Sequence, residues 1–223
     1  MRKAQLLLFI CLCVPLSLAA APPQTPTPQP TPTPTPAANK DDYETLLARV
    51  QKGDRTVDFK ALRFAYTETK AYNPYNSDRE ARKAMFAALN SKEFDKVLAQ
   101  AEKILSQNYV DISAHFGAYV AHKELQHAEQ AALHKFIVDG LLKSITSSGD
   151  GKTAATAFVV ISTDEEYALF NFAGLRPTQQ ALVNENGHAY DKMTAVDPET
   201  NQTVIYFFNI DKPFGWLAHG LSH

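Results

Sequence analysis

A single stretch, residues 144–162 (SITSSGDGKTAATAFVVIS), separates two parts of the chain whose apolar residues follow different spacings. Before it, apolar residues recur every three or four positions, which is the spacing of one helix face. After it, they form short runs rich in β-branched and aromatic residues, which is typical of strands. The pattern predicts one α+β domain over residues 41–223, with a helical half at 41–147 and a sheet half at 153–211.

The helical half is most clearly periodic at residues 94–105. The apolar members of this stripe are Phe94, Val97, Leu98, Ala101, Ile104 and Leu105. Asp58 and Asp111 precede further periodic segments and are predicted N-caps, because a carboxylate at that position accepts free backbone N–H groups. On the helix after Asp111, the residues expected to be buried are Ile112, Phe116, Tyr119 and Val120.

Residues 89–111 resemble the second arm and exit turn of a tetratricopeptide repeat, with Phe94, Val97 and Ala101 at the packing positions. The Trp, Leu and Gly of the first arm are absent, and the following helix pair does not repeat the sequence pattern. Two interpretations stay open, an array of TPR-like helical hairpins and an ordinary helical bundle. In both, the helices cover one face of the sheet half.

The sheet half is predicted to be a mainly antiparallel sheet of about four strands with one inserted helix. Asn186-Gly187 predicts a hairpin, since a type I′ turn needs positive φ at both positions. The segment 203–210 (TVIYFFNI) is apolar at both parities, so we expect a central strand covered on both faces. Residues 163–166 (TDEE) are interpreted as a capping box that starts the inserted helix, with Thr163 at the N-cap.

The loop Gly149-Asp150-Gly151-Lys152-Thr153 resembles the end of a phosphate-binding loop. A Walker loop requires a further glycine where this chain has Thr146, and it leaves a strand to open a helix. Here the order is reversed, because a predicted helix precedes the loop and a strand follows it. We therefore interpret the loop as a helix C-cap and turn.

Four histidines lie in the helical half, in two pairs with a spacing of seven: His115 with His122, and His127 with His134. Two ligands of one metal ion on a helix need a spacing of three or four, so neither pair can share an ion. A pair across the hairpin, such as His115 with His134, is allowed, but no third ligand is spaced to complete it. A contact between Asp111 and His115 is the simpler expectation, and we predict no metal site and no cofactor.

The N-terminus has the pattern of a secretory signal peptide at residues 1–19, with cleavage between Ala19 and Ala20. Its apolar run is shorter than the roughly 20 residues of a membrane span, so no transmembrane helix is expected in the mature chain. Cys11 and Cys13 both lie in this run, and neither follows a small residue, so the sequence does not predict a lipoprotein. Residues 20–40 are rich in Pro and Thr and are predicted to be a disordered spacer.

The chain carries a formal charge of −2 and no cluster of Lys and Arg along its sequence, so we expect no nucleic-acid partner. Without the signal peptide it has no cysteine, and therefore no thiolate metal site or cysteine nucleophile. Export to the periplasm or the extracellular space is the predicted location.

Several segments together resemble an exported bacterial family known only as domain of unknown function 4919. These segments are KGD from Lys52, VDFKALR from Val57, YNPY from Tyr72, NYVDISAH from Asn108, GLLKSITSSGDGKT from Gly140, TAFVVI from Thr156, EEY from Glu165, GHAYD from Gly187 and YFFNID from Tyr206. The resemblance covers most of residues 42–211. It implies a location and a domain extent, and it implies no activity.

The absence of a catalytic motif and the presence of helical hairpins favour a non-catalytic protein-interaction or envelope-associated module, with a protein partner in the cell envelope. The alternative is an envelope hydrolase or a small-ligand-binding protein. Its site would lie where the glycine loop meets the sheet, and the candidate ligand-binding residues there are Asp150, Lys152 and His188.

Overall fold

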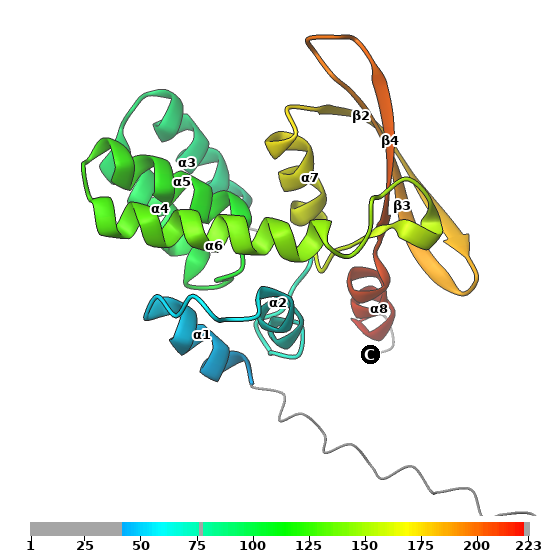
Figure 1. Cartoon of the computed structure of the whole chain (residues 1–223), viewed down its shortest axis with the longest axis horizontal. Coiled ribbons are helices and arrows are strands. Elements are labelled where there is room, and N and C mark those ends of the chain that lie inside the picture. The colour runs from blue at the N-terminus through cyan, green and yellow to red at the C-terminus, as the bar shows by residue number, and fades with distance from the viewer. Residues whose placement is uncertain (1–41, 76–77, 221–223) are drawn as a thin grey trace, which may run out of the picture. The chain divides into compact units, whose positions relative to one another are not determined.

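The computed structural model describes residues 42–75 and 78–220, with side chains as far as residue 217. The predicted signal peptide, with its cleavage site, and the predicted spacer lie outside the described residues. The helical half consists of α1 (Tyr43–Gln51), α2 (Phe59–Tyr66), α3 (Arg79–Asn90), α4 (Phe94–Leu105), α5 (Ile112–Glu124) and α6 (Ala128–Thr146). The sheet half consists of η1 (Ala154–Thr156), β1 (Phe158–Val159), α7 (Thr163–Phe172), β2 (Arg176–Glu185), β3 (His188–Val196), β4 (Thr203–Asn209) and α8 (Asp211–Gly220) (Figure 1). The α+β class, with one helix inserted among the strands, is confirmed.

Aspartates begin the early helices, as the sequence predicts. The carboxylate of Asp58 accepts from the backbone N–H groups of Lys60 and Ala61, and that of Asp111 accepts from Ala114. Each bond satisfies a donor that has no partner within the helix itself. These interactions span three residues or fewer, which is why the sequence alone identifies them.

The hairpins α3–α4 and α5–α6 pack side by side around a small apolar core. The predicted stripe of α4 supplies the buried Val97, Ala101 and Ile104. The buried face predicted for α5 is wrong apart from Ile112, because Phe116, Tyr119 and Val120 are only partly buried. The buried residues of α5 are Ile112, Ala114, His115, Gly117, Ala118 and Ala121. A Cβ atom at Gly117 would lie 2.8 Å from the sulfur of Met85, so the close approach of α3 to α5 demands small residues on this face.

The four-stranded sheet has the order β1-β4-β3-β2, with β1 parallel to β4 and the other pairs antiparallel. The Asn186-Gly187 turn joins β2 to β3 with positive φ at both residues, as predicted. The expected central place of β4 is confirmed, but its expected cover on both faces is wrong, since Ile205 is 43% exposed. Strand β1 pairs only Phe158 and Val159 with β4, so most of β4 has no strand partner on that side among the described residues, and the loop at Gly151 bonds to Phe207 there instead.

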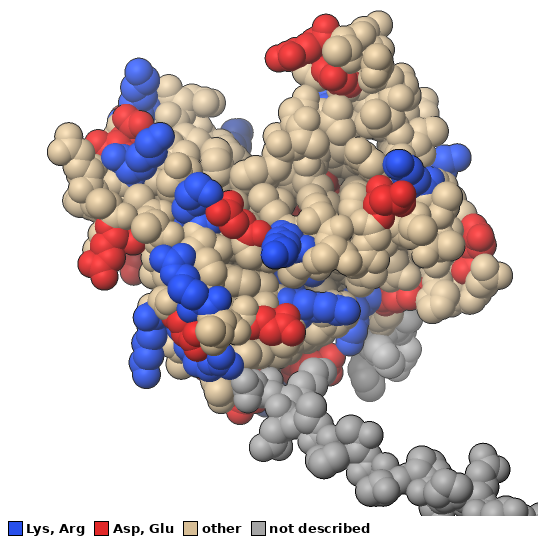
Figure 2. All heavy atoms as spheres, viewed as in Figure 1, with Lys and Arg blue, Asp and Glu red and all other residues tan. Residues whose placement is uncertain are grey.

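A second apolar core joins the long helix α6 and α7 to one face of the sheet. Leu141, Ile145, Phe170, Met193 and Phe208 are among its buried members. The sequence did not predict α8, which packs against β3 (Figure 1). On the face drawn in Figure 2, Lys and Arg side chains alternate with Asp and Glu. In the part of the chain with defined structure, no helix combines the length and the apolar character needed to cross a membrane.

Candidate functional site: a polar pocket at the start of helix α7

The acidic triplet Asp164-Glu165-Glu166 opens α7, but it does not form the predicted capping box. The N-cap residue is Ser162, whose side chain makes no capping bond, and both Glu165 and Glu166 are buried. Successive residues on a helix point about 100° apart, so the three carboxylates reach three different environments. The capping-box interpretation was therefore wrong.

Glu165 forms a buried ion pair with Arg63 of α2. The guanidinium donates two hydrogen bonds to the carboxylate, at 2.7 Å and 2.5 Å, and its remaining N–H groups reach Ser144 Oγ and the carbonyl of Val159. The same carboxylate accepts from the backbone N–H of Ile161. A buried pair is tolerated only when its hydrogen-bonding capacity is filled in this way, so Arg63 joins α2, α6, β1 and α7 at one point.

Arg82 of α3 lies between two further carboxylates. Its Nη2 atom is 2.6 Å from Asp111 and 3.0 Å from Asp164. Burial opposes the charged form of Arg82, but the two carboxylates outweigh burial and raise its pKa. Asp111 therefore both caps α5 and holds a cation, a role that sequence spacing did not reveal.

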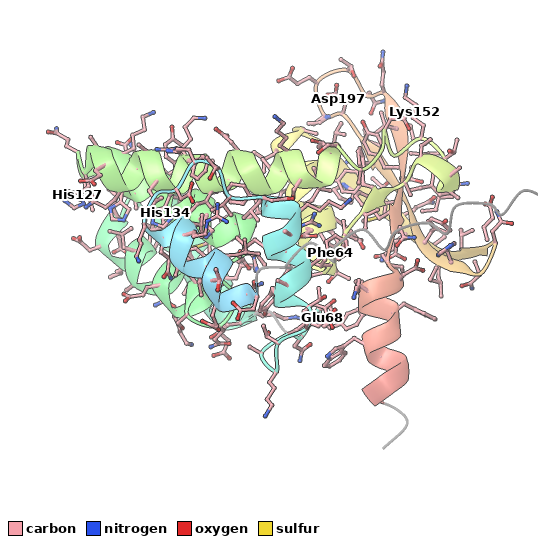
Figure 3. All side chains as sticks on the ribbon, turned by 60° about the horizontal axis from the view of Figure 1, so that its bottom comes forward. Phe64, Glu68, His127, His134, Lys152 and Asp197 are labelled. Atoms are coloured by element: carbon pink, nitrogen blue, oxygen red, sulfur yellow. The ribbon has the colours of Figure 1, made fainter. Side chains whose placement is uncertain are left out.

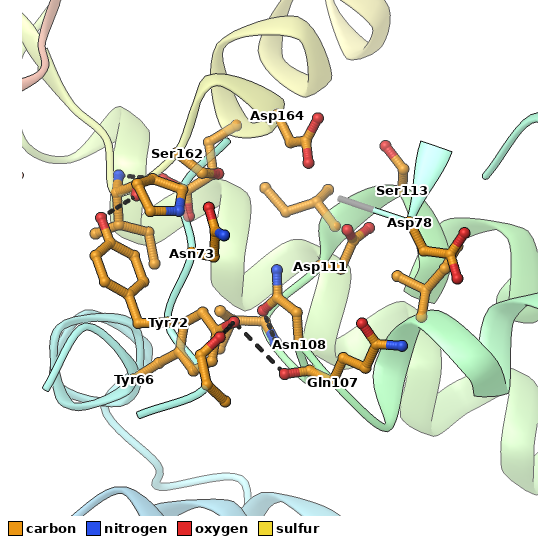
Figure 4. A pocket seen from close by; sticks show the side chains of 17 residues that line it. Tyr66, Tyr72, Asn73, Asp78, Gln107, Asn108, Asp111, Ser113, Ser162 and Asp164 are labelled. Carbon is orange, nitrogen blue, oxygen red and sulfur yellow. Dashed lines mark hydrogen bonds between the residues drawn. The ribbon is translucent and has the colours of Figure 1, made fainter. Parts of the chain in front are cut away.

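A polar pocket lies between these ion pairs, with a cavity volume of about 80 Å³ (Figure 4). Tyr72 and Asn73 come from the segment after α2, Asn108 from the α4–α5 turn, and Ser162 and Asp164 from the start of α7. The other lining residues are Tyr66, Ala71, Pro74, Asp78, Ile104, Gln107, Val110, Asp111, Ile112, Ser113, Ile161 and Glu165. Four of the lining residues are acidic and none is Lys, Arg or His.

The tyrosines of the pocket are fixed hydrogen-bond donors. The hydroxyl of Tyr72 donates to the carbonyl of Ile161 at 2.6 Å, and that of Tyr66 faces the carbonyls of Ala71 and Gln107. Burial raises the pKa of Tyr66 to about 12, and burial together with Glu165 raises that of Tyr72. Both hydroxyls are therefore protonated at neutral pH. Tyr72 ties the segment after α2 to the residues before α7, and Tyr66 ties α2 to that segment and to the α4–α5 turn.

Three polar side chains of the lining make no hydrogen bond within the described residues: those of Gln107, Ser113 and Ser162. Exposed amide and hydroxyl groups beside carboxylates are suited to a ligand that donates hydrogen bonds. No lining hydroxyl is hydrogen-bonded to a base in the manner of an activated nucleophile.

Glu166 lies on the other side of the same helix turn, fully buried against the sheet. Its two oxygens accept no hydrogen bond from the described residues, but the protonated carboxyl group can donate one to Asp191 of β3. Burial first, and Asp191 second, raise the pKa of Glu166 to about 9. Gln180 donates to Asp191 at 2.7 Å. The proton of the pair is therefore held on Glu166 at neutral pH. Burial also raises the pKa of Asp191, and the hydrogen bonds from Gln180 and Glu166 oppose that rise.

The ligand-binding residues predicted at the glycine loop lie at the surface, and their role stays a prediction. Lys152 is 76% exposed, and its Nζ atom is 3.9 Å from Asp150 (Figure 3). His188 instead pairs with Asp211 at 2.6 Å. Asp150, Lys152 and His188 do not line the polar pocket at the start of α7.

The loop itself is a packed turn that leaves α6 for η1 and β1, as predicted. The N–H of Gly151 donates to the carbonyl of Thr156 and its own carbonyl accepts from Phe207, at 2.8 and 2.7 Å. A Cβ atom at Gly149 would lie 2.1 Å from the Thr156 oxygen. Both glycines therefore serve the turn.

Sequence reasoning did not identify Arg63, Arg82 and Asp164 as site residues. One available signal was the pair of arginines on the buried sides of amphipathic helices, since a cation there requires an acidic partner. The acidic triplet supplies these partners, Glu165 for Arg63 and Asp164 for Arg82. Interpreting the triplet as a capping box left no reason to look for distant cations.

A comparison with protein families matches residues 36–216 to the family described as Domain of unknown function (DUF4919). The chain belongs to this family. The match confirms the resemblance drawn from the sequence segments, five of which contribute residues to the polar pocket or its ion pairs. No curated protein and no solved structure matches the chain.

Proposed function

We propose that this DUF4919 protein is an exported, non-catalytic binding module whose polar pocket receives a protonated amine, such as a lysine side chain, from a protein partner in the cell envelope. The observation that carries the proposal is the composition of the pocket. It presents acidic, amide and hydroxyl groups and no cation to a small enclosed space.

The charge of the pocket favours a cation. Four lining carboxylates belong to Asp78, Asp111, Asp164 and Glu165, and the cations that pair with them are Lys103, Arg82 and Arg63. In a partly buried setting, a positive group about 4 Å from one of these carboxylates is attracted to it by on the order of 1–4 kcal/mol.

The size of the pocket favours one end of a side chain over a free metabolite. A volume of about 80 Å³ has room for several water-sized groups, since each needs roughly 10–15 Å³. Pockets for drug-sized ligands measure about 300–1,000 Å³. A pocket of this size adds specificity to a larger contact surface, which is consistent with an interaction module.

A titration with a short acetylated Ala-Lys-Ala peptide, followed by amide chemical shifts, tests the proposal. Shifts should concentrate at the pocket, and the same peptide with an acetylated lysine should cause none. Gln107 is an exposed lining residue with no side-chain partner among the described residues, so it offers matched variants. Gln107→Glu should strengthen binding about threefold or more and Gln107→Lys should weaken it, because each changes one charge at the rim.

The proposal would be refuted if the peptide whose lysine side chain is acetylated bound as tightly as the peptide with a free lysine side chain. Equal affinities of the two Gln107 variants for the free-lysine peptide would also refute it. Loss of binding in Lys152→Ala with retention in Gln107→Lys would assign the site to the glycine loop instead.

Export rests on the N-terminal pattern of Arg2, Lys3 and the apolar run that follows. N-terminal sequencing of the mature protein should begin at Ala20, and an intact Met1 in all fractions would contradict export.

A further inference from the structure

Four histidines come together on the α5–α6 hairpin, away from the polar pocket. The Nδ1 atoms of His115 and His134 are 2.8 Å apart, and those of His122 and His127 are 3.2 Å apart. The ring of His122 stacks on that of His134 with 5.4 Å between centroids. Hydrogen bonds therefore do not join the residues that are seven positions apart in the sequence. They join His115 to His134 and His122 to His127, across the hairpin.

The inner pair, His115 with His134, is joined by a hydrogen bond whose donor and acceptor can both be assigned. His115 Nε2 lies 2.8 Å from the carbonyl of Tyr109, so this nitrogen carries the proton and donates. The Nδ1 atom of neutral His115 must then accept from the Nδ1–H of His134. The predicted helix-start contact with Asp111 is made by the backbone, because the N–H of His115 donates to the carbonyl of Asp111 at 3.1 Å, while the imidazole of His115 bonds to His134. This bond fixes the ring of His134, on which His122 stacks.

The outer pair, His122 with His127, is brought together by the backbone turn that ends α5. At the end of α5, the N–H of His127 donates to the carbonyl of His122 at 2.8 Å, and that of Gln126 donates to Lys123 at 3.1 Å. Gln126 has φ of 61°. These are the bonds of a Schellman motif, which places the side chains of His122 and His127 next to each other.

The same turn ends α1, α3 and α7, where the equivalent side chains differ. The equivalent pairs are Arg49 with Asp54, Ala88 with Glu93, and Phe170 with Leu175, each joined by the corresponding backbone bond. Within this one chain the turn therefore forms with an ion pair, a small and an acidic residue, or two apolar residues. The turn does not require histidine, so its backbone geometry does not explain why both positions at the tip of this hairpin are histidine.

We propose that His122 and His127 bind a divalent first-row transition ion, with Zn²⁺ as the type case, through their Nδ1 atoms. Two imidazole nitrogens bound to one tetrahedral Zn²⁺ lie about 3.3 Å apart, given Zn–N distances of roughly 2.0–2.1 Å. The 3.2 Å between His122 and His127 is a long hydrogen bond when no metal is present, and it is close to this spacing, whereas the 2.8 Å between His115 and His134 is too short for it. Imidazole is a preferred ligand of Zn²⁺, Cu²⁺ and Ni²⁺.

The site is an open one. Among the side chains described, those of residues 42–75 and 78–217, no three His, Cys, Asp or Glu residues surround a common metal position, so this part of the protein supplies two ligands. Water or a group from another molecule completes the coordination. Figure 3 shows His127 at the end of α6 and His134 further along it, so the outer pair lies at the accessible tip of the hairpin.

Calorimetric titration of the protein with ZnCl₂ tests the assignment, in a background with His219 and His223 replaced by alanine to remove the C-terminal imidazoles. We expect one saturable Zn²⁺ per chain. The double variant His122→Phe with His127→Leu copies the pair that α7 uses in the same turn and contains no metal ligand. It should fold, as judged by circular dichroism, and bind Zn²⁺ at least about tenfold more weakly, since losing even an outer-shell partner costs 10–100-fold. His188→Ala is the control and should bind normally.

The absence of saturable Zn²⁺ binding would overturn the proposal. So would an unchanged affinity in the folded Phe–Leu variant, or a loss in His188→Ala equal to that in the double variant.

Discussion

Replacing Glu166 with glutamine should stabilise the protein at neutral pH, because the buried carboxyl group has to take up a proton on folding and the amide does not. Glu166 is fully buried, its oxygens accept no hydrogen bond from the described residues, and its pKa is raised to about 9, first by burial and then by Asp191. The folded protein therefore keeps the proton at pH 7, whereas the unfolded chain releases it. Glutamine keeps the shape of the protonated side chain and has no proton to release on unfolding.

The expected gain follows from proton linkage. Because the folded pKa of Glu166 lies above its ordinary value of 4.5, its contribution to stability is complete below pH 4.5 and is lost progressively up to about pH 9. Each pH unit between 4.5 and 7 costs about 1.36 kcal/mol, so the loss at pH 7 is on the order of 3 kcal/mol. At pH 5 it is below about 1 kcal/mol.

Urea denaturation of the wild type and of Glu166→Gln at pH 5, 7 and 8.5 measures this difference. The variant should gain little at pH 5 and progressively more at pH 7 and 8.5. If the variant is less stable at pH 7, or if the difference does not grow with pH, Glu166 is ionised in the folded protein and the reasoning fails. Glu165→Gln is the matched control on the same helix turn, and it should move stability in the opposite direction.

Three further predictions follow from neighbouring features. Glu165→Gln leaves the buried Arg63 without its counter-charge and should cost about 3–5 kcal/mol, measured by the same denaturation; a cost below 1 kcal/mol would show that water reaches Arg63. Gly151→Ala should destabilise by about 2 kcal/mol or more, because φ is +69° and a Cβ atom would lie 2.4 Å from the ring of Phe158; an unchanged Tm would contradict this packing. Lys92→Gly should stabilise by about 0.5–1 kcal/mol, since Lys92 has φ of 57° at the end of α3, and a loss of stability would mean that its side chain contributes more than its backbone strain costs.

Features that depend on short stretches of chain could be predicted. The caps at Asp58 and Asp111 and the Asn186-Gly187 turn each rest on bonds within a few residues. The change from helical to strand spacing likewise reflects local periodicity, and it gave the fold class. The stripe on α4 was correct because its apolar residues are large and regularly spaced.

The candidate sites depend on residues far apart in the chain. Arg63 and Glu165, which are 102 positions apart, meet only because the tertiary structure brings α2, the end of α6 and β1 to the start of α7. Periodicity reports which face of a helix is apolar, but not how closely a neighbour approaches it. For this reason the small-residue face of α5 was missed.

By itself, the amino-acid sequence determined most of the helices, strands and turns and their order, though not α8, because hydrogen bonds and backbone preferences within a few residues set them. Only the tertiary structure decided the partners of the charged and imidazole side chains. Removal from water makes an unpaired charge costly, and only the packed arrangement of helices and sheet determines which carboxylates are removed from water and which cations reach them.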